Sequence, residues 1–207
     1  MTTQDSAMLA FAGCTVFLLL AFGLRTVVQL QRTGSSGFVG ISGLPGSAEW
    51  TGGVLFVVAL LAGVAAPLLQ LAGAAVPSPA FGAAWIRDAG IALYTVGVLG
   101  TLWAQFAMGD SWRIGVDTGA RTSLVQRGPF RWVRNPIYTA MTAATLGLAL
   151  VVPNLVALFA VVALIAALEI QVRLVEEPYL LRAHGDDYRR YAAGTGRFLP
   201  GIGRALG

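Results

Sequence analysis

Two long stretches of this chain carry no charged residue, and they constrain its fold more than any other feature. The first lies between Glu49 and Arg87, and the second covers residues 137–168. A helix that spans a membrane needs about 20 mostly apolar residues. Only 12% of all residues are charged, about half the share that a soluble globular domain carries. We therefore expect an all-α integral membrane protein.

About five transmembrane helices are expected. Three of them fall in the first half of the chain, at residues 7–24, 52–76 and 89–108. The second uncharged stretch is too long for one helix, and Pro153-Asn154 divides it into a helical hairpin, because proline breaks a helix but starts a new one easily. The fourth helix would end at Val152 and span only about 24 Å at 1.5 Å per residue. The fifth would begin at Asn154 and project beyond the membrane as far as Pro178.

Arginine indicates the orientation, since all 14 basic residues are arginine. Most of them lie between the third and fourth helices or in the C-terminal tail, and the loop between the second and third helices has only Arg87. Cytoplasmic loops carry the excess of basic residues. We therefore expect the N-terminus outside, and the C-terminus, a short helical tail and the active site in the cytoplasm. The loop at residues 29–51 has one arginine and one glutamate and does not indicate its side.

The distribution of polar residues predicts the organisation of the chain. Residues 1–108 would form three N-terminal transmembrane helices and residues 109–207 the catalytic part, within one membrane domain. A pI near 9.8 could suggest nucleic acid, but arginines beside apolar segments fit a membrane surface better, so no nucleic-acid partner is expected. The chain has one cysteine, Cys14, and one histidine, His184, which predicts no metal site.

The segment before the fourth helix combines anion donors with aromatic surfaces. Pro136 can begin the helix with Asn135 as its N-cap, and the first turn then offers free N–H groups to a carboxylate. Arg134 adds a fork-shaped donor, and we expect Asn135 also to donate to the anion. Phe130 and Tyr138 offer flat apolar surfaces.

The fifth helix ends in a row of charged residues. Glu169, Arg173 and Glu176 share one helical face, Glu177 lies four residues after Arg173, and Glu169 and Arg173 can pair. A solvated charge ladder explains most rows of this kind, but an acid that follows a long uncharged stretch is a functional candidate. Two adjacent glutamates at a helix C-terminus oppose the helix dipole, so arginines or a cationic ligand should compensate. S-adenosylmethionine combines a carboxylate, a cation, an adenine and a ribose diol, and therefore fits both segments.

These two segments resemble the isoprenylcysteine carboxyl methyltransferase family, which is related to the phospholipid N-methyltransferases. The chain reads LVQRGPFRWVRNPIY at residues 124–138 and EEPYLLRAHGDDYRRYAAGTGRFLP at residues 176–200. The family pattern is roughly LVxxGxYxxxRHPxY, a helical hairpin, EExxLxxxFGxxYxxY and a closing R-x-x-P. The resemblance covers about residues 109–200 and implies an integral-membrane enzyme that uses S-adenosylmethionine.

The resemblance also implies site residues. Arg134 is expected to serve the reaction as a donor, and Glu176, Glu177 and His184 are the candidate bases. Arg173 follows Val172, which holds the position of the family's substrate-side arginine. Asn135 stands where the family usually has histidine. The implied cofactor contacts are Thr122, Ser123, Leu124, Val125, Phe130, Asn135, Pro136, Ile137, Tyr138 and Glu176.

The expected function is methyl transfer from S-adenosylmethionine to a lipophilic acceptor reached through the membrane, either a small molecule or a lipidated substrate. A carboxylate acceptor needs no base, because it is ionised near neutral pH, whereas an amine or hydroxyl acceptor does. Two other classes stay open: a small membrane transporter or channel, and a membrane reductase that uses NADPH. The sequence does not indicate the oligomeric state.

The arginine distribution makes a testable prediction about topology. A reporter fused after Gly207 is expected to be active only in the cytoplasm, because both arginine-rich segments should stay on that side. Paired reporters, one active in each compartment, measure this directly. Activity of the fusion in the external compartment alone would overturn the orientation.

Overall fold

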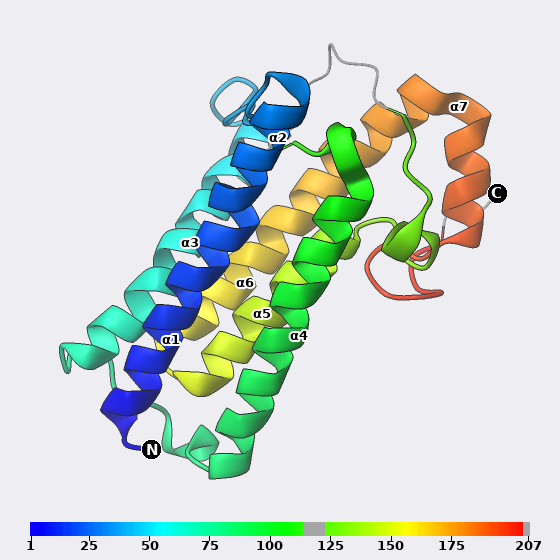
Figure 1. The fold of residues 1–207 in the computed structure, drawn as a ribbon. Coiled ribbons are helices and arrows are strands. Elements are labelled where there is room, and N and C mark those ends of the chain that lie inside the picture. Colours follow the sequence, from blue (N-terminus) through cyan, green and yellow to red (C-terminus); the bar gives the residue numbers. More distant parts are fainter. Residues whose placement is uncertain (114–122, 205–207) are drawn as a thin grey trace.

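The computed structural model describes residues 1–113 and 123–204, and helices make up most of them (Figure 1). The described residues contain no β-strand, and a single parallel β-bridge joins Val133 to Gly196. The all-α prediction is confirmed.

The N-terminal helix is continuous from Thr3 to Thr33. It consists of α1 (Thr3–Leu18), a π-helical turn (Leu19–Leu24) and α2 (Arg25–Thr33). Thr2 and Asp5 form a capping box, in which each side chain accepts from the backbone N–H of the other, so that two N–H groups of the first turn are satisfied. The helix is longer than the predicted span at residues 7–24.

Two further long helices follow. Helix α3 (Ala48–Leu71) begins earlier than the predicted span at residues 52–76, because the Ser47 side chain caps it by accepting from the N–H of Trp50 at 3.2 Å. Helix α4 (Ala84–Met108) likewise begins before the predicted span at residues 89–108. Short 3₁₀ turns lie at Pro79–Phe81 and Gly109–Ser111.

The predicted hairpin is confirmed. It consists of α5 (Pro136–Val151) and α6 (Leu155–Ile170), which meet at Pro153-Asn154. Asn154 caps α6, since its Oδ1 accepts from the N–H of Ala157 at 2.9 Å, and its Nδ2 donates to the carbonyl of Ala66 on α3 at 3.1 Å. A second π-helical turn (Gln171–Glu176) continues α6 into α7 (Glu177–Gly194). A 3₁₀ turn at Gly128–Arg131 precedes α5.

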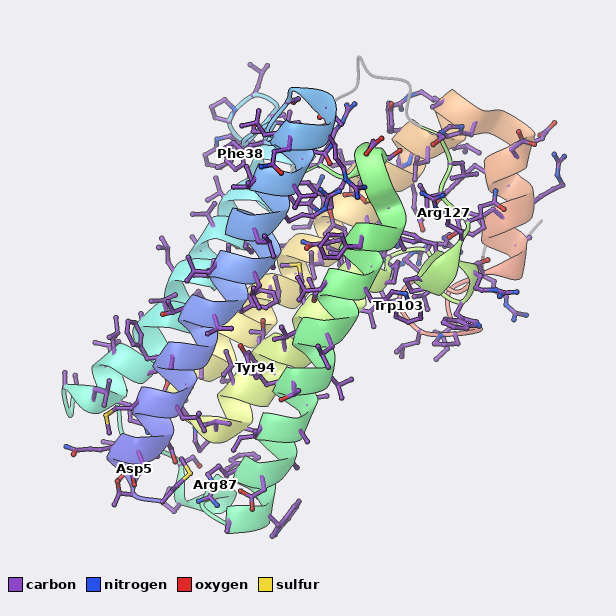
Figure 2. All side chains as sticks on the ribbon, in the orientation of Figure 1. Asp5, Phe38, Arg87, Tyr94, Trp103 and Arg127 are labelled. Carbon is purple, nitrogen blue, oxygen red and sulfur yellow. The ribbon has the colours of Figure 1, made fainter. Side chains whose placement is uncertain are left out.

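The helices form one elongated bundle in which the chain passes back and forth between two ends (Figure 1). The N-terminus, the α3–α4 connection and the α5–α6 turn lie at one end, where Figure 2 shows Asp5 and Arg87. The loop after α2, which carries Phe38, and helix α7 lie at the opposite end. The first loop and the C-terminal tail therefore share one end of the molecule.

The described residues include four helical stretches long and apolar enough to cross a membrane: Thr3–Thr33, Ala48–Leu71, Ala84–Ser111 and Leu155–Gly194. Helix α5 is apolar but shorter, with 16 residues. The protein is thus an integral membrane protein with several membrane-spanning helices, and a fifth crossing by α5 stays a prediction.

Helices α4 and α5 pack closely because small residues face each other. A Cβ on Gly97 would lie 2.4 Å from the backbone nitrogen of Ala144, and a Cβ on Gly147 would lie 2.4 Å from the backbone nitrogen of Tyr94. Small residues let backbones approach in lipid, where apolar side chains gain little by leaving the solvent. Tyr94 also donates its hydroxyl to the carbonyl of Gly13 at 2.7 Å, which fastens α1 to the same pair.

We predict that Gly97→Val destabilises the bundle by about 1–3 kcal/mol, the usual cost of adding atoms to a closely packed interface. Thermal denaturation in detergent measures the loss. Gly23→Val is the matched control, because a Cβ on Gly23 would meet no atom within 4 Å. Equal melting temperatures for the two variants would contradict the packing argument.

Candidate active site

A cavity of about 380 Å³ lies at the end of the bundle that carries α7, and its volume is within the usual range for small-molecule sites. Residues of the α4 end, the start of α5, the second π-helical turn and α7 line one part of it. Residues of the first loop and the start of α3 line the rest. Both predicted parts of the chain, residues 1–108 and residues 109–207, therefore contribute to the cavity wall.

Nine of the predicted cofactor contacts line this cavity. They are Ser123, Leu124, Val125, Phe130, Asn135, Pro136, Ile137, Tyr138 and Glu176. The tenth, Thr122, lies outside the described residues. The tertiary structure thus brings together positions that lie on both sides of the helical hairpin, and their contact with a cofactor stays a prediction.

Glu176 and Tyr138 form the polar centre of the cavity. The Tyr138 hydroxyl donates to Oε1 of Glu176 at 2.6 Å, and both residues line the cavity wall. Glu176 is the last residue of the second π-helical turn. Such turns are rare in proteins, and those that occur are often found at functional sites. The carboxylate is thereby held in one position while it still faces the cavity.

Glu177 points instead into an ion-pair cluster with Arg134 and Arg197. Its Oε1 accepts from Nη2 of Arg134 and from Nε of Arg197, both at 2.8 Å, and its Oε2 accepts from Nη2 of Arg197 at 2.9 Å. These hydrogen bonds raise the pKa of Arg197 above the ordinary value for a guanidinium. Arg134, Glu176 and Glu177 all line the cavity. The two adjacent glutamates nevertheless differ: arginines compensate the charge of Glu177, as the sequence predicted, whereas Glu176 accepts from Tyr138.

Arg134 holds the C-terminal tail. Its Nη1 donates to the carbonyls of Ala192 and Thr195, and its Nη2 donates to the carbonyl of Gly203 at 3.0 Å. The residue is only 7% exposed. Of the three guanidinium nitrogens of Arg134, only Nε has no hydrogen-bond partner in the described residues. The tail and Glu177 therefore use most of the donor that the sequence predicted for an anion.

The prediction that the Asn135 side chain caps the helix is wrong. Asn135 occupies the N-cap position of α5, but its side chain makes no capping hydrogen bond. Nδ2 of Asn135 donates to the carbonyl of Arg197 at 3.1 Å, and so does the Asn135 backbone N–H. The reason is that the tail runs beside this segment, where the N–H of Arg134 also donates to the carbonyl of Gly196 at 2.8 Å.

Arg173 does not join Arg134 and Glu177. It pairs with Glu169 on the outer face of the helix, as predicted, and its side chain is 53% exposed. It is absent from the lining of the cavity. Val172, its neighbour, is fully buried. A role for Arg173 at the reacting atoms would require the helix to turn, so the fold gives it no direct contact with the site.

A sharp bend in α7 completes the wall. Gly185 has φ 52° and ψ −123°, a backbone conformation that favours glycine. The helix after this bend turns back toward the start of α5, and the hydroxyl of Tyr191 donates to the carbonyl of Phe130 at 2.6 Å. Tyr188 and Tyr191 thereby line the cavity.

The N-terminal lining is the part that sequence reasoning missed. A Cβ on Gly53 would lie 3.1 Å from Ile41, and a Cβ on Gly52 would lie 3.2 Å from Oε1 of Gln171, so the first loop and α3 pack closely against the site. The adjacent glycines at the start of α3 were the one signal in the sequence. The residues that line this side include Phe22, Phe38, Ile41, Ser42, Glu49, Gly52, Gly53 and Phe56.

A buried arginine fastens this N-terminal side to the end of α4. Arg25 is 1% exposed, and its Nη2 donates to the carbonyl of Gly109 at 2.5 Å. Its guanidinium lies 4.7 Å from the ring centroid of Trp112, a cation–π contact. Trp112 lines the cavity, so Arg25 positions part of the wall without being part of it.

The structure is similar to that of the eukaryotic intramembrane Ras methyltransferase ICMT (isoprenylcysteine carboxyl methyltransferase), with a TM-score of 0.63 and 18% sequence identity over 97% of this chain and 70% of that chain. Among curated proteins, none is similar enough in sequence to match.

The sequence matches a family model. Residues 85–187 match the family described as phospholipid methyltransferase. The protein is therefore a membrane-embedded methyltransferase. This class replaces the transporter and reductase alternatives, and it implies a methyl donor.

We predict that Glu177→Gln lowers stability by about 3 kcal/mol, because it leaves the buried charge of Arg134 without its partner. Thermal denaturation and trypsin cleavage at Arg197 measure the loss and the release of the tail. The control is Asp187→Asn, since Asp187 pairs with Arg190 on the exposed surface, where an ion pair contributes little. Unchanged melting and cleavage of Glu177→Gln would contradict a structural role for this cluster.

Proposed function

We propose that the protein transfers a methyl group from S-adenosylmethionine to a lipophilic acceptor, and that the acceptor group is a carboxylate. The observation that carries the proposal is the position of Glu176. Its carboxylate accepts a hydrogen bond from Tyr138 and lies at the cavity wall. The start of α5 lines one side of this cavity, and apolar side chains inside the bundle line the other.

The residues on the α5 side fit the polar parts of S-adenosylmethionine. The first N–H groups of a helix have no intrahelical partner and suit a carboxylate, and residues 135–138 line the cavity. Glu176 can accept hydrogen bonds from a ribose diol or an amine. Phe130, Tyr188 and Tyr191 offer aromatic surfaces for an adenine. When bound, S-adenosylmethionine supplies an electrophilic methyl group.

The arrangement of the carboxylates favours a carboxylate acceptor. A carboxylate is already ionised near neutral pH, so the chain needs only to align it with the methyl group and to exclude water. Both oxygens of Glu177 accept from arginines, which removes this residue as a general base. Glu177 and Arg134 would then serve by positioning the start of α5, and Arg173 would act only from outside the cavity.

A second candidate acceptor is the amine of a phospholipid headgroup. The description of the matched family favours it, and Glu176 is then the nearest carboxylate that could accept the proton. An acceptor of either kind is lipophilic and would enter from the membrane.

We also propose that this end of the molecule faces the cytoplasm. Arg113, Arg127, Arg131 and the tail arginines lie at the end that carries the cavity, and the excess of basic residues marks the cytoplasmic side. The N-terminus lies at the opposite end and would then be outside.

We predict that purified protein binds S-adenosylhomocysteine and not NADPH in calorimetric titrations, and that Glu176→Gln weakens the binding about ten- to a hundredfold, because a hydrogen bond to a charged group is lost. Glu169→Gln is the control, since Glu169 belongs to the outer ion pair with Arg173. Equal affinities of the two variants would assign Glu176 to a structural role.

The acceptor is identified with S-adenosylmethionine that carries a radiolabelled methyl group. A prenylated cysteine and a fatty acid test the carboxylate, and phosphatidylethanolamine tests the amine. A base-labile methyl ester supports the proposal, because amine products keep their methyl group in base. Label in phosphatidylethanolamine alone would replace the carboxylate with the amine.

A further inference from the structure

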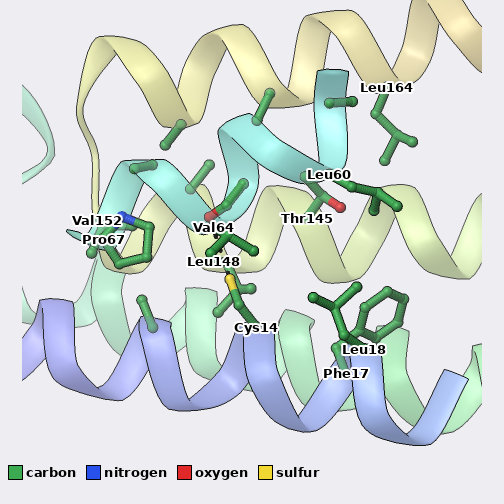
Figure 3. Close-up of a pocket in the computed structure, with 17 residues that line it drawn as sticks. Cys14, Phe17, Leu18, Leu60, Val64, Pro67, Thr145, Leu148, Val152 and Leu164 are labelled. Atoms are coloured by element: carbon green, nitrogen blue, oxygen red, sulfur yellow. Dashed lines mark hydrogen bonds between the residues drawn. The ribbon is translucent and has the colours of Figure 1, made fainter. Parts of the chain in front are cut away.

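A second, smaller cavity lies deeper in the bundle, and the proposed reaction does not use it. It has a volume of about 50 Å³ and lies between α1, α3, α5 and α6 (Figure 3). Cys14 of α1 and Leu148 of α5 point into it in Figure 3. A cavity needs roughly 10–15 Å³ to hold one water molecule, so this cavity has room for about four groups of that size.

The two cavities belong to one seam. Leu60 of α3 lines both of them. On each of the four helices, a residue that lines the active-site cavity is separated by three or four positions from one that lines the deeper cavity, so both sets lie on the same helical face. The residue numbers fall towards the deeper cavity on α1 and α6 and rise towards it on α3 and α5. These series are Phe22, Leu18 and Cys14; Phe56, Leu60, Val64 and Pro67; Met141, Thr145, Leu148 and Val152; and Leu168, Leu164, Ala160 and Ala157.

The chemistry of the deeper cavity admits only hydrocarbon. Its lining is aliphatic and aromatic apart from Cys14 and Thr145. The sulfur of Cys14 donates to the carbonyl of Gly63 at 3.4 Å, and the hydroxyl of Thr145 donates to the carbonyl of Met141 at 3.0 Å. Both polar side chains are thus satisfied by backbone, and a polar ligand group would lose its own hydrogen bonds there.

We infer that the hydrocarbon tail of the methyl acceptor binds inside the bundle, along this seam, with its end beside Cys14. The inference rests on the proposed function, because it is the acceptor held near Glu176 whose tail enters the seam. Phe56 packs in the same cluster as Tyr138, and Pro67 lies about 16 Å further along α3 at 1.5 Å per residue. The seam therefore selects long tails, since short ones end before the deeper cavity.

Cys14 makes the inference testable without the reaction, because it is the single thiol of the chain. The rate of its alkylation by N-ethylmaleimide is measured by mass spectrometry on the full-length protein in detergent, with S-adenosylhomocysteine present. We expect palmitate to slow the alkylation about tenfold and octanoate to leave it unchanged, because only the longer chain reaches the thiol.

Filling the deeper cavity provides a second test. Gly63 lines the deeper cavity, and a Cβ on it would meet no atom within 4 Å, so the side chain of Gly63→Leu begins in open space and takes up part of the cavity. We expect this variant to bind palmitate about tenfold more weakly or worse and to bind and methylate octanoate within twofold of the parent protein. Gly23→Leu is the matched control, since Gly23 is exposed and also has open space around its Cβ.

The outcomes separate this inference from the proposed function. Equal alkylation with palmitate and octanoate, together with unchanged palmitate binding by Gly63→Leu, would overturn the inference. Alkylation that is slowed by bilayer phospholipid alone and is insensitive to palmitate would also overturn it and assign the seam to a resident lipid. Failure of the parent protein to methylate any carboxylate would contradict the proposed function. The protection of Cys14 from alkylation would still test separately whether a hydrocarbon tail binds beside it.

Discussion

The active-site end of this molecule depends on one carboxylate, Glu177, placed between the guanidiniums of Arg134 and Arg197. The cluster joins the start of α7 to the segment before α5 and to the tail that follows α7. A buried charge is tolerated only when it is paired and hydrogen-bonded. Both carboxylate oxygens of Glu177 accept hydrogen bonds from arginines. The cluster thereby sets the position of α5, whose first residues line the cavity. It also leaves Glu176, the preceding residue in the chain, to face the cavity.

The lipid solvent explains how so short a helix as α5 is held in place. Apolar side chains gain little by leaving lipid, so close backbone contact and internal hydrogen bonds must position the helix. Gly97 and Gly147 supply the contact with α4, and Asn154 fastens the hairpin turn to α3. Helix α5 is thereby positioned as one wall of the cavity, and its apolar face continues into the bundle.

The cavity combines two kinds of wall. The motif-bearing half of the chain supplies Tyr138 and Glu176, and the N-terminal half supplies the first loop and the start of α3. The first set is polar and precise, as the recognition of a small donor requires. The second set is mostly apolar and opens toward the seam between the helices, as the proposed lipophilic acceptor requires. Acceptor choice would then depend in part on residues outside the family-matched segment 85–187.

The sequence by itself determined the membrane helices, the hairpin at Pro153-Asn154 and the residues of the motif that line the cavity, because apolar length, proline and motif spacing are local properties. Only the tertiary structure decided where side chains turn. Arg134 reaches carbonyls far along the chain, Asn135 bonds the tail and does not cap its helix, and Arg173 faces outward. The first loop, with no motif and little charge, also became part of the site. These outcomes depend on which distant segments pack together, and that information is not carried by any one stretch of residues.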